Sequence, residues 1–262
     1  MNRWPAALGG EAQAWPKRQG FDPRSTKRHG QGKLCFKRSG QQPKQTPPED
    51  PYTPPLHQDI RQEIPMKILV NLFHSDLQKS TVNRRWLREL ESHSELTINQ
   101  PYSQYPDGII NIAREQQLLQ EHDRIVFQHP FLWYSVPPLM KQWLDDVLTY
   151  GWAYGPGGTA LHGKDWVSVI STGGPKESYQ AGGFNNFSMS ELLKPLQQTA
   201  NLIGANYLAP FVFHGTVQAS PDAIEASAAE LIRHITNPEL DPKLRLKRLQ
   251  GELKQAGITM DH

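Results

Sequence analysis

The 262-residue chain has very little cysteine and lacks long apolar runs. Its one cysteine, Cys35, excludes a disulfide framework and a cysteine-rich metal site, and it fits a reducing, cytoplasmic compartment. Apolar runs of roughly 18 residues or more are absent, so we expect no transmembrane helix. Pro5, Gly9, Gly10 and Pro16 interrupt the first residues, so we expect no signal peptide there.

Charge is unevenly distributed along the chain. Residues 1–65 hold 11 Lys and Arg against 6 Asp and Glu, whereas residues 66–262 hold 17 against 20. The basic excess therefore belongs to the N-terminal stretch, and the rest of the chain is mildly acidic. An acidic domain argues against a nucleic-acid-binding core, so we expect no nucleic-acid partner.

Residues 1–65 contain ten prolines, and no helical or strand period persists in them. Such a composition buries too little apolar surface to offset its ordering entropy, which predicts a disordered, Pro-rich, basic extension. The segment is interpreted either as a tail that contacts acidic lipid or a partner, or as residues translated from upstream of the true start. The second interpretation is favoured because Met66 opens a strand directly.

Strand patterns alternate with helix patterns from Met66 onward. Strand-like runs occupy residues 67–73, 96–99, 124–128, 166–171 and 206–213. Helical periods occupy residues 83–90, 109–120, 138–148, 189–203 and 221–235. This alternation predicts an α/β fold with a five-stranded parallel sheet, helices on both faces and the flavodoxin-like order 2-1-3-4-5. We expect the domain to span residues 66–240, followed by a charged surface or interface helix and tail at 241–262.

Ligands of such folds bind beyond the carboxyl ends of the strands, where the loops after strands one, three and four meet. The first of these loops contains His74 and Lys79 and leads through Ser80, Thr81 and Asn83 into a helix. A helix N-terminus with several polar donors suits a phosphate. An ordinary N-cap is the alternative, since a cap needs only one such residue. The G-x-x-x-x-G-K pattern of a P-loop is absent.

The loop after the third strand is aromatic, although turns are usually small and polar. Phe131, Trp133 and Tyr134 lie between Pro130 and the pair Pro137-Pro138, which stiffen both ends. Rigidly held aromatic rings at the ligand edge suit a flat heteroaromatic ring. A core or dimer contact is the alternative.

The loop after the fourth strand reads Ser171-Thr172-Gly173-Gly174-Pro175. Paired glycines permit close backbone approach to a ligand, although a plain turn would use them as well. Taken together, the three loops predict one ligand with a phosphate at one end and a ring at the other, which describes FMN or FAD.

A resemblance supports this prediction. The run FQHPFLWYSVPPLMKQWLDDVLTYGWAYGPGGTALHG at residues 127–163 resembles the flavodoxin-like NAD(P)H:quinone oxidoreductases, and above all the ancillary subunits of glutathione-gated potassium efflux, the KefF/KefG group. Tyr105-Pro106-Asp107 and Arg114-Glu115-Gln116 also fit that group. The resemblance extends over about residues 66–237.

The resemblance implies three sets of FMN-binding residues. The phosphate and ribityl chain would contact His74, Ser80, Thr81, Val82 and Asn83. The isoalloxazine would be bordered by Phe131, Leu132, Trp133 and Tyr134. Its edge would be hydrogen-bonded by Ser171, Thr172, Gly173 and Gly174.

The resemblance also implies a homodimer that passes hydride from NAD(P)H through FMN to a quinone or another electrophile. The alternative is a regulatory subunit that docks on a membrane potassium-efflux transporter, with incidental redox activity. That role would place the protein on the inner face of the cell membrane.

Animal quinone reductases carry a tyrosine and a histidine after the fourth strand, and both assist hydride transfer. Tyr179 matches the tyrosine by spacing, whereas Phe184-Asn185-Asn186 stands where the histidine would fall. The regulatory alternative gains weight from that difference. His129, between an apolar strand and Pro130, is expected to make a structural hydrogen bond rather than to catalyse.

Overall fold

The computed structural model describes residues 66–256. The predicted extension at residues 1–65 and the end of the predicted C-terminal tail lie outside the described residues.

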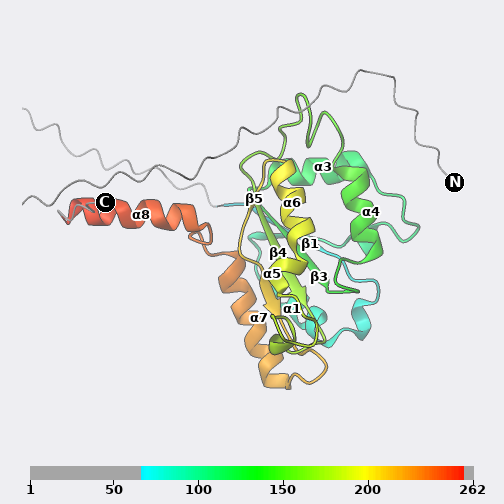
Figure 1. Ribbon diagram of the computed structural model, residues 1–262. Coiled ribbons are helices and arrows are strands. Elements are labelled where there is room, and N and C mark those ends of the chain that lie inside the picture. The colour runs from blue at the N-terminus through cyan, green and yellow to red at the C-terminus, as the bar shows by residue number, and fades with distance from the viewer. Residues whose placement is uncertain (1–65, 257–262) are drawn as a thin grey trace, which may run out of the picture. The chain divides into compact units, whose positions relative to one another are not determined.

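A parallel sheet forms the centre of the domain (Figure 1). Its strands are β1 (Ile68–Leu72), β2 (Leu96–Asn99), β3 (Arg124–Pro130), β4 (Asp165–Ser171), β5 (Asn206–Tyr207) and β6 (Phe211–Phe213). The order is β2-β1-β3-β4-β5, and every pairing is parallel. Chain order reverses beside β1, so the loops after β1 and β3 meet at one edge, as the sequence predicts.

Helices fill the connections between the strands. They are α1 (Thr81–Glu91), α2 (Pro101–Gln104), α3 (Ile112–Glu121), α4 (Pro138–Val147), α5 (Met189–Leu192), α6 (Lys194–Leu202), α7 (Pro221–Ile235) and α8 (Pro242–Gln255). Two short 3₁₀ turns, η1 (Leu77–Lys79) and η2 (Lys176–Ser178), follow β1 and β4.

Two predicted elements are divided in the structure. The strand expected at 206–213 is split into β5 and β6, which both pair with β4, so the sheet has six strands rather than five. Pro210 lies between them and has no N–H to donate to the ladder. The helix expected at 189–203 is likewise split into α5 and α6, with Pro195 in the first turn of α6.

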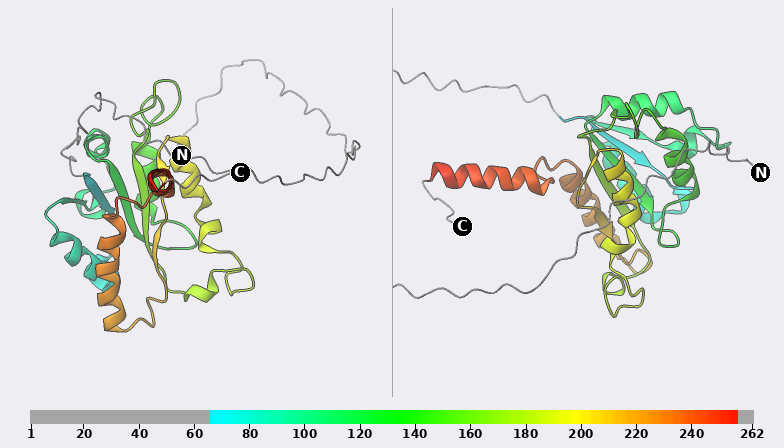
Figure 2. Two further views of the ribbon diagram at one scale, coloured as in Figure 1. Left: turned by 90° about the vertical axis from the view of Figure 1, so that its left-hand side faces the viewer. Right: turned by 45° about the horizontal axis from the view of Figure 1, so that its top comes forward.

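Apolar side chains cover both faces of the sheet. One core contains Leu69, Ile125 and Trp166 beneath α3, α4 and α6, and the other contains Val70, Val126 and Val167 beneath α1 and α7. Figure 2 shows these helices on the two sides of the sheet. Neighbouring residues of a strand point to opposite faces, so a continuous apolar run fills both cores, as expected for a doubly covered parallel sheet.

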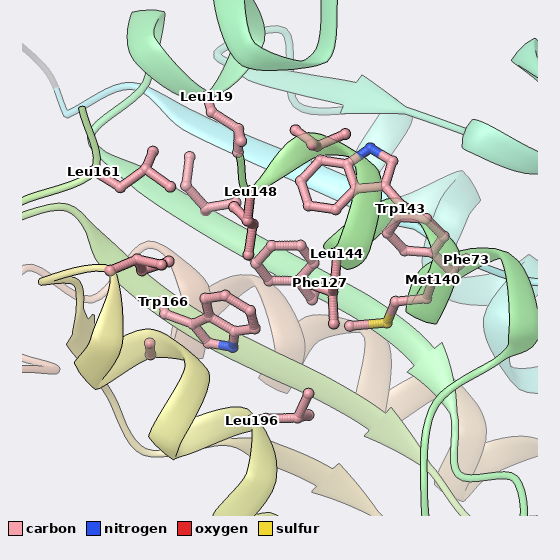
Figure 3. Packing of buried hydrophobic residues seen from close by; sticks show 14 of the residues in the cluster. Phe73, Leu119, Phe127, Met140, Trp143, Leu144, Leu148, Leu161, Trp166 and Leu196 are labelled. Carbon is pink, nitrogen blue, oxygen red and sulfur yellow. The ribbon is translucent and has the colours of Figure 1, made fainter. Parts of the chain in front are cut away.

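Several aromatic rings pack against one another in the core beneath α4 (Figure 3). Phe127 of β3 stacks on Trp166 of β4 with ring centroids 4.2 Å apart, and its other edge meets Trp143 at 5.7 Å. Trp143 donates its indole N–H to the buried Glu115 at 2.8 Å. Tyr105 donates to the same carboxylate at 2.7 Å, so this buried charge has several donors.

Helix α8 differs from the other long helices because none of its residues is buried. Arg248 of α8 pairs with Glu239 before the helix and with Glu252 within it. Among the helices of residues 66–256, none is long and apolar enough to cross a membrane.

Candidate functional site

Two adjoining clefts open at the carboxyl edge of the sheet. The first, of about 440 Å³, lies between the loops after β1, β3, β4 and β6. The second, of about 380 Å³, lies between the aromatic turn after β3 and the segment after β4. Phe131 and Gly173 line both clefts, so the two form one continuous site.

Every residue predicted to bind the cofactor lines one of these clefts. The first is lined by His74, Ser80, Thr81, Val82, Asn83, Phe131, Leu132, Ser171 and Gly173. The second is lined by Phe131, Trp133, Tyr134, Thr172, Gly173, Gly174 and the predicted catalytic Tyr179. The fold thus brings the predicted residues together, while their individual roles toward a ligand stay a prediction.

The N-terminus of α1 forms one wall of the first cleft. Ser80 caps the helix, because its Oγ accepts the backbone N–H of Asn83 at 3.1 Å. Thr81 and Val82 follow it and line the cleft, and residues at this position in a helix have backbone N–H groups without an intrahelical acceptor. Ser80 thus provides the ordinary cap, and the backbone N–H groups of Thr81 and Val82 stay available, so the phosphate role of this loop stays a prediction.

Asn83 joins three of the chain segments around the first cleft. Its Nδ2 donates to Ser171 Oγ at 2.9 Å and to Ser80 Oγ at 3.2 Å, and its Oδ1 accepts from Gln128 Nε2 at 3.2 Å. The side chain is 2% exposed. Both amide hydrogens are used within the protein, so the side chain of Asn83 fixes the cleft floor by linking α1 to β3 and β4.

His74 presents a donor to the first cleft. The backbone N–H of Asp76 donates to His74 Nδ1 at 3.1 Å, which leaves the hydrogen of the neutral ring on Nε2. Burial lowers the pKa of His74 below its ordinary value, although the nearby Asp76 carboxylate opposes that shift. Asp76 itself pairs with Lys79.

The aromatic turn is a strained two-residue hairpin. Leu132 and Ser135 exchange backbone hydrogen bonds of 3.2 and 2.9 Å. The two central residues, Trp133 and Tyr134, have φ values of 49° and 60°, in the left-handed region that glycine usually occupies. Trp133 is 93% exposed, so no packing within residues 66–256 compensates its conformation. This exposure excludes the interpretation of Trp133 as a core residue.

Asn185 fastens the aromatic turn to the segment after β4. Its Oδ1 accepts the hydroxyl hydrogen of Tyr134 at 3.1 Å. Both residues line the second cleft, so the bond closes one side of it. Asn185 lies in the tripeptide that stands where the animal enzymes carry histidine, and here its amide has a positioning contact.

Tyr179 reaches into the second cleft from the end of η2. Its hydroxyl lies 2.5 Å from Thr172 Oγ1, and its ring meets Phe131 edge-on at 6.2 Å between centroids. A Cβ on Gly174 would lie 3.1 Å from the Tyr179 hydroxyl oxygen, so the second glycine of the loop leaves room for this ring. Thr172 and Gly174 therefore set the position of the phenol.

Sequence reasoning missed the contribution of the chain after β6. Thr216 and Val217 line the first cleft, and the ring of His214 lies 5.5 Å from that of Tyr179. Burial lowers the pKa of His214, with a smaller effect from Lys176 in the same direction. The available signal was the end of the fifth predicted strand, because all parallel strands of a sheet end at the same edge.

His129 makes the structural hydrogen bond expected of it. It is fully buried in β3, and its Nδ1 lies 3.0 Å from the carbonyl oxygen of Pro130. Among the described residues, its Nε2 has no hydrogen-bonding partner. Burial lowers the pKa of His129 to about 4, with the Pro130 bond opposing the shift.

Comparison with known proteins assigns the family. Residues 66–235 match the family model described as having a flavodoxin-like fold. The chain belongs to this family. The match covers the whole sheet and ends with α7, so α8 lies beyond it.

Two curated relatives are similar to this chain over nearly their full length. The Bacillus subtilis protein named uncharacterized NAD(P)H oxidoreductase YdeQ is 47% identical over 194 residues, which are 74% of this chain and 98% of the relative. The potassium-efflux ancillary protein KefG of Serratia proteamaculans is 41% identical over 174 residues, 66% of this chain and 95% of the relative.

Two solved structures share the fold. General stress protein 14 of Treponema denticola, in complex with FMN, has a TM-score of 0.62 at 41% identity and covers 63% of this chain and 95% of its own. An NADPH-quinone reductase from P. pentosaceus has a TM-score of 0.61 at 31% identity and covers 66% and 99%.

The buried His129 predicts a pH-dependent stability. The unfolded imidazole binds a proton below about pH 6.5, whereas the folded one stays neutral down to about pH 4. The free energy of unfolding should therefore fall as pH decreases through this window, by up to about 3 kcal/mol. His129→Asn keeps a donor for Pro130 and should flatten the dependence in urea unfolding at several pH values. His162→Asn, which removes an exposed imidazole, should leave the pH dependence of the free energy of unfolding unchanged.

The strained turn predicts an unusual response to glycine. Trp133→Gly should raise the free energy of unfolding by roughly 1 kcal/mol relative to Trp133→Ala, because only glycine adopts a positive φ without steric cost. Urea unfolding of the two variants measures the difference. The matched pair Val217→Gly and Val217→Ala, at an exposed site with ordinary φ, should show no such gain. A Trp133→Gly variant less stable than Trp133→Ala would contradict the strain.

Proposed function

We propose that the protein is an FMN-dependent NAD(P)H oxidoreductase that transfers two electrons as hydride to a quinone or another electrophile. The observation that carries this function is the continuity of the two clefts through Phe131 and Gly173. One ligand with an anionic end and an aromatic end fits such a site, and FMN has that form. Relatives named NAD(P)H oxidoreductase and NADPH-quinone reductase, and the FMN complex of general stress protein 14, support it.

The residues of the first cleft suit the FMN phosphate. The neutral His74 offers Nε2–H, Thr81 offers a hydroxyl, and the start of α1 offers backbone N–H groups with the positive end of the helix dipole. Asp76 also lines the first cleft, but its carboxylate is paired with Lys79. It therefore repels a bound anion less than an unpaired carboxylate would.

The residues of the second cleft suit the isoalloxazine ring. The Trp133 indole is exposed there and is free to stack, and Phe131 borders the junction of the clefts. Gly173 and Gly174 permit backbone groups to approach the ring edge. FMN supplies the hydride-transfer chemistry when bound, while the protein supplies placement and electrostatics.

Tyr179 is the proton-handling residue that we assign to the second cleft. Its hydroxyl can donate to negative charge that develops during transfer, and the short contact with Thr172 Oγ1 holds it in place. The hydroxyl of Tyr134 is engaged by Asn185. An amide has no proton to release near neutral pH, so Asn185 does not replace a histidine in this role.

A regulatory role is the second candidate function. The 41% identity to KefG favours docking on a membrane potassium-efflux transporter at the cytoplasmic face. The segment after β4 has no histidine to assist Tyr179 in hydride transfer. This difference from the animal enzymes also favours the regulatory role. We further propose a homodimer, whose contact would cover exposed apolar groups near the site such as Phe184.

Flavin loading and reduction test the enzyme directly. The full chain should bind FMN with quenching of flavin fluorescence, and stopped-flow absorbance should show its reduction by NADH or NADPH. Trp133→Gly should weaken FMN affinity by about 0.5–1.5 kcal/mol, since it removes a stacking surface. A folded full-length protein without measurable flavin affinity would refute the proposal.

Tyr179→Phe separates catalysis from binding. The variant should leave FMN affinity unchanged and lower kcat/KM for a soluble quinone by roughly tenfold or more, because the lost hydroxyl acts on charge that develops in the transition state. Tyr134→Phe is the matched control, since it removes a hydroxyl of the same cleft that is already engaged by Asn185. Equal kcat/KM values in wild type and Tyr179→Phe would remove Tyr179 from the mechanism.

A further inference from the structure

Helix α8 carries a charge opposite to that of the domain before it. Its 14 residues read PKLRLKRLQGELKQ and hold five basic residues against one acidic residue. Residues 66–241 hold 12 Lys and Arg against 18 Asp and Glu. A basic helix that follows an acidic domain gives the molecule one strongly cationic element within the described residues.

The helix also carries an apolar stripe in which no residue is buried. Leu246, Leu249 and Leu253 are spaced three and four residues apart and share one face. Leu246 and Leu249 are 55% and 41% exposed. Leu244 is equally exposed but lies on the opposite side of the helix, so it is not part of the stripe.

Basic side chains border this stripe on both sides. On a helix with 3.6 residues per turn, Lys243 and Lys247 lie on one flank of the leucines and Arg245 lies on the other. Arg248 stands farther round and is held by Glu239 and Glu252. Leucines flanked by long cationic side chains form the pattern of a helix that lies in the interface of an anionic bilayer.

We propose that α8 docks the protein on an anionic lipid surface. The leucine stripe would enter the boundary of the acyl chains, and Lys243, Lys247 and Arg245 would reach the phosphates of the headgroups. Charge complementarity selects this occupant over α8 of a second copy, because two helices with the same cationic flanks repel each other. The anionic lipid surface repels the acidic domain, so we expect α8 to be the part of the protein that contacts the lipid.

Vesicle co-sedimentation of the full chain tests the proposal. The protein should partition onto vesicles of phosphatidylcholine with phosphatidylglycerol about tenfold or more above vesicles of phosphatidylcholine alone, and added salt should weaken this binding. The assay needs no flavin, so its outcome is independent of the proposed enzymatic function.

Matched variants assign the binding to the stripe and its flanks. Leu246→Gln with Leu249→Gln should lower partitioning about tenfold, while Leu244→Gln should leave it unchanged. Lys243→Gln with Arg245→Gln and Lys247→Gln should lower it similarly. As a control, three exposed basic residues of the domain are replaced instead (Lys141→Gln, Lys194→Gln and Arg233→Gln). This variant should partition onto the vesicles as the wild type does. Circular dichroism verifies that each variant is folded.

Three outcomes would overturn the proposal. Full-chain protein that ignores anionic vesicles would exclude lipid docking. Unchanged binding in the leucine variant would move the contact to another part of the chain, such as the basic residues 1–65. Loss of an oligomer in sedimentation velocity on substitution of the leucines, without vesicle binding by wild type, would show that the stripe contacts a second copy.

Discussion

The buried amide of Asn83 is the contact on which the site depends. It links the cap of α1 through Ser80 to the end of β4 through Ser171, and it accepts from Gln128 of β3. These three segments come from distant parts of the chain and carry different parts of the cleft wall. Because the amide is buried, each of its bonds would be costly to lose, so the segments around the first cleft are held in one geometry.

Strain in the aromatic turn is tolerated because its surroundings are fixed. Phe131 donates its backbone N–H to Ser171 at 2.8 Å, and Tyr134 is tied to Asn185. Two consecutive non-glycine residues with positive φ cost of order 1–3 kcal/mol each, and the exposed Trp133 regains none of this by packing against the part of the chain that the structure describes. Strain at an exposed aromatic residue beside a cleft is the pattern of a surface shaped for a ligand.

The sequence predicted the sheet order and the lining residues from the loops after β1, β3 and β4, since apolar periods locate strands and parallel strands place their following loops together. The sequence did not predict that the last strand is divided at Pro210, because the apolar residues before Pro210 continue the strand pattern. The sequence also did not predict the positive φ of Trp133 and Tyr134, because neither residue type favours that conformation. The sequence placed the end of the last strand at this edge of the sheet, but not the ring of His214 beside that of Tyr179.

The second cleft combines a well-placed aromatic surface with few groups that can exchange protons. Tyr179 is held by Thr172, and Asn185 serves to hold Tyr134. Trp133 and Phe184 at its rim are 93% and 88% exposed in the single chain, so aromatic surface borders the opening of this cleft. The lining of this cleft therefore offers a ligand aromatic surface for stacking more than it offers hydrogen-bonding groups.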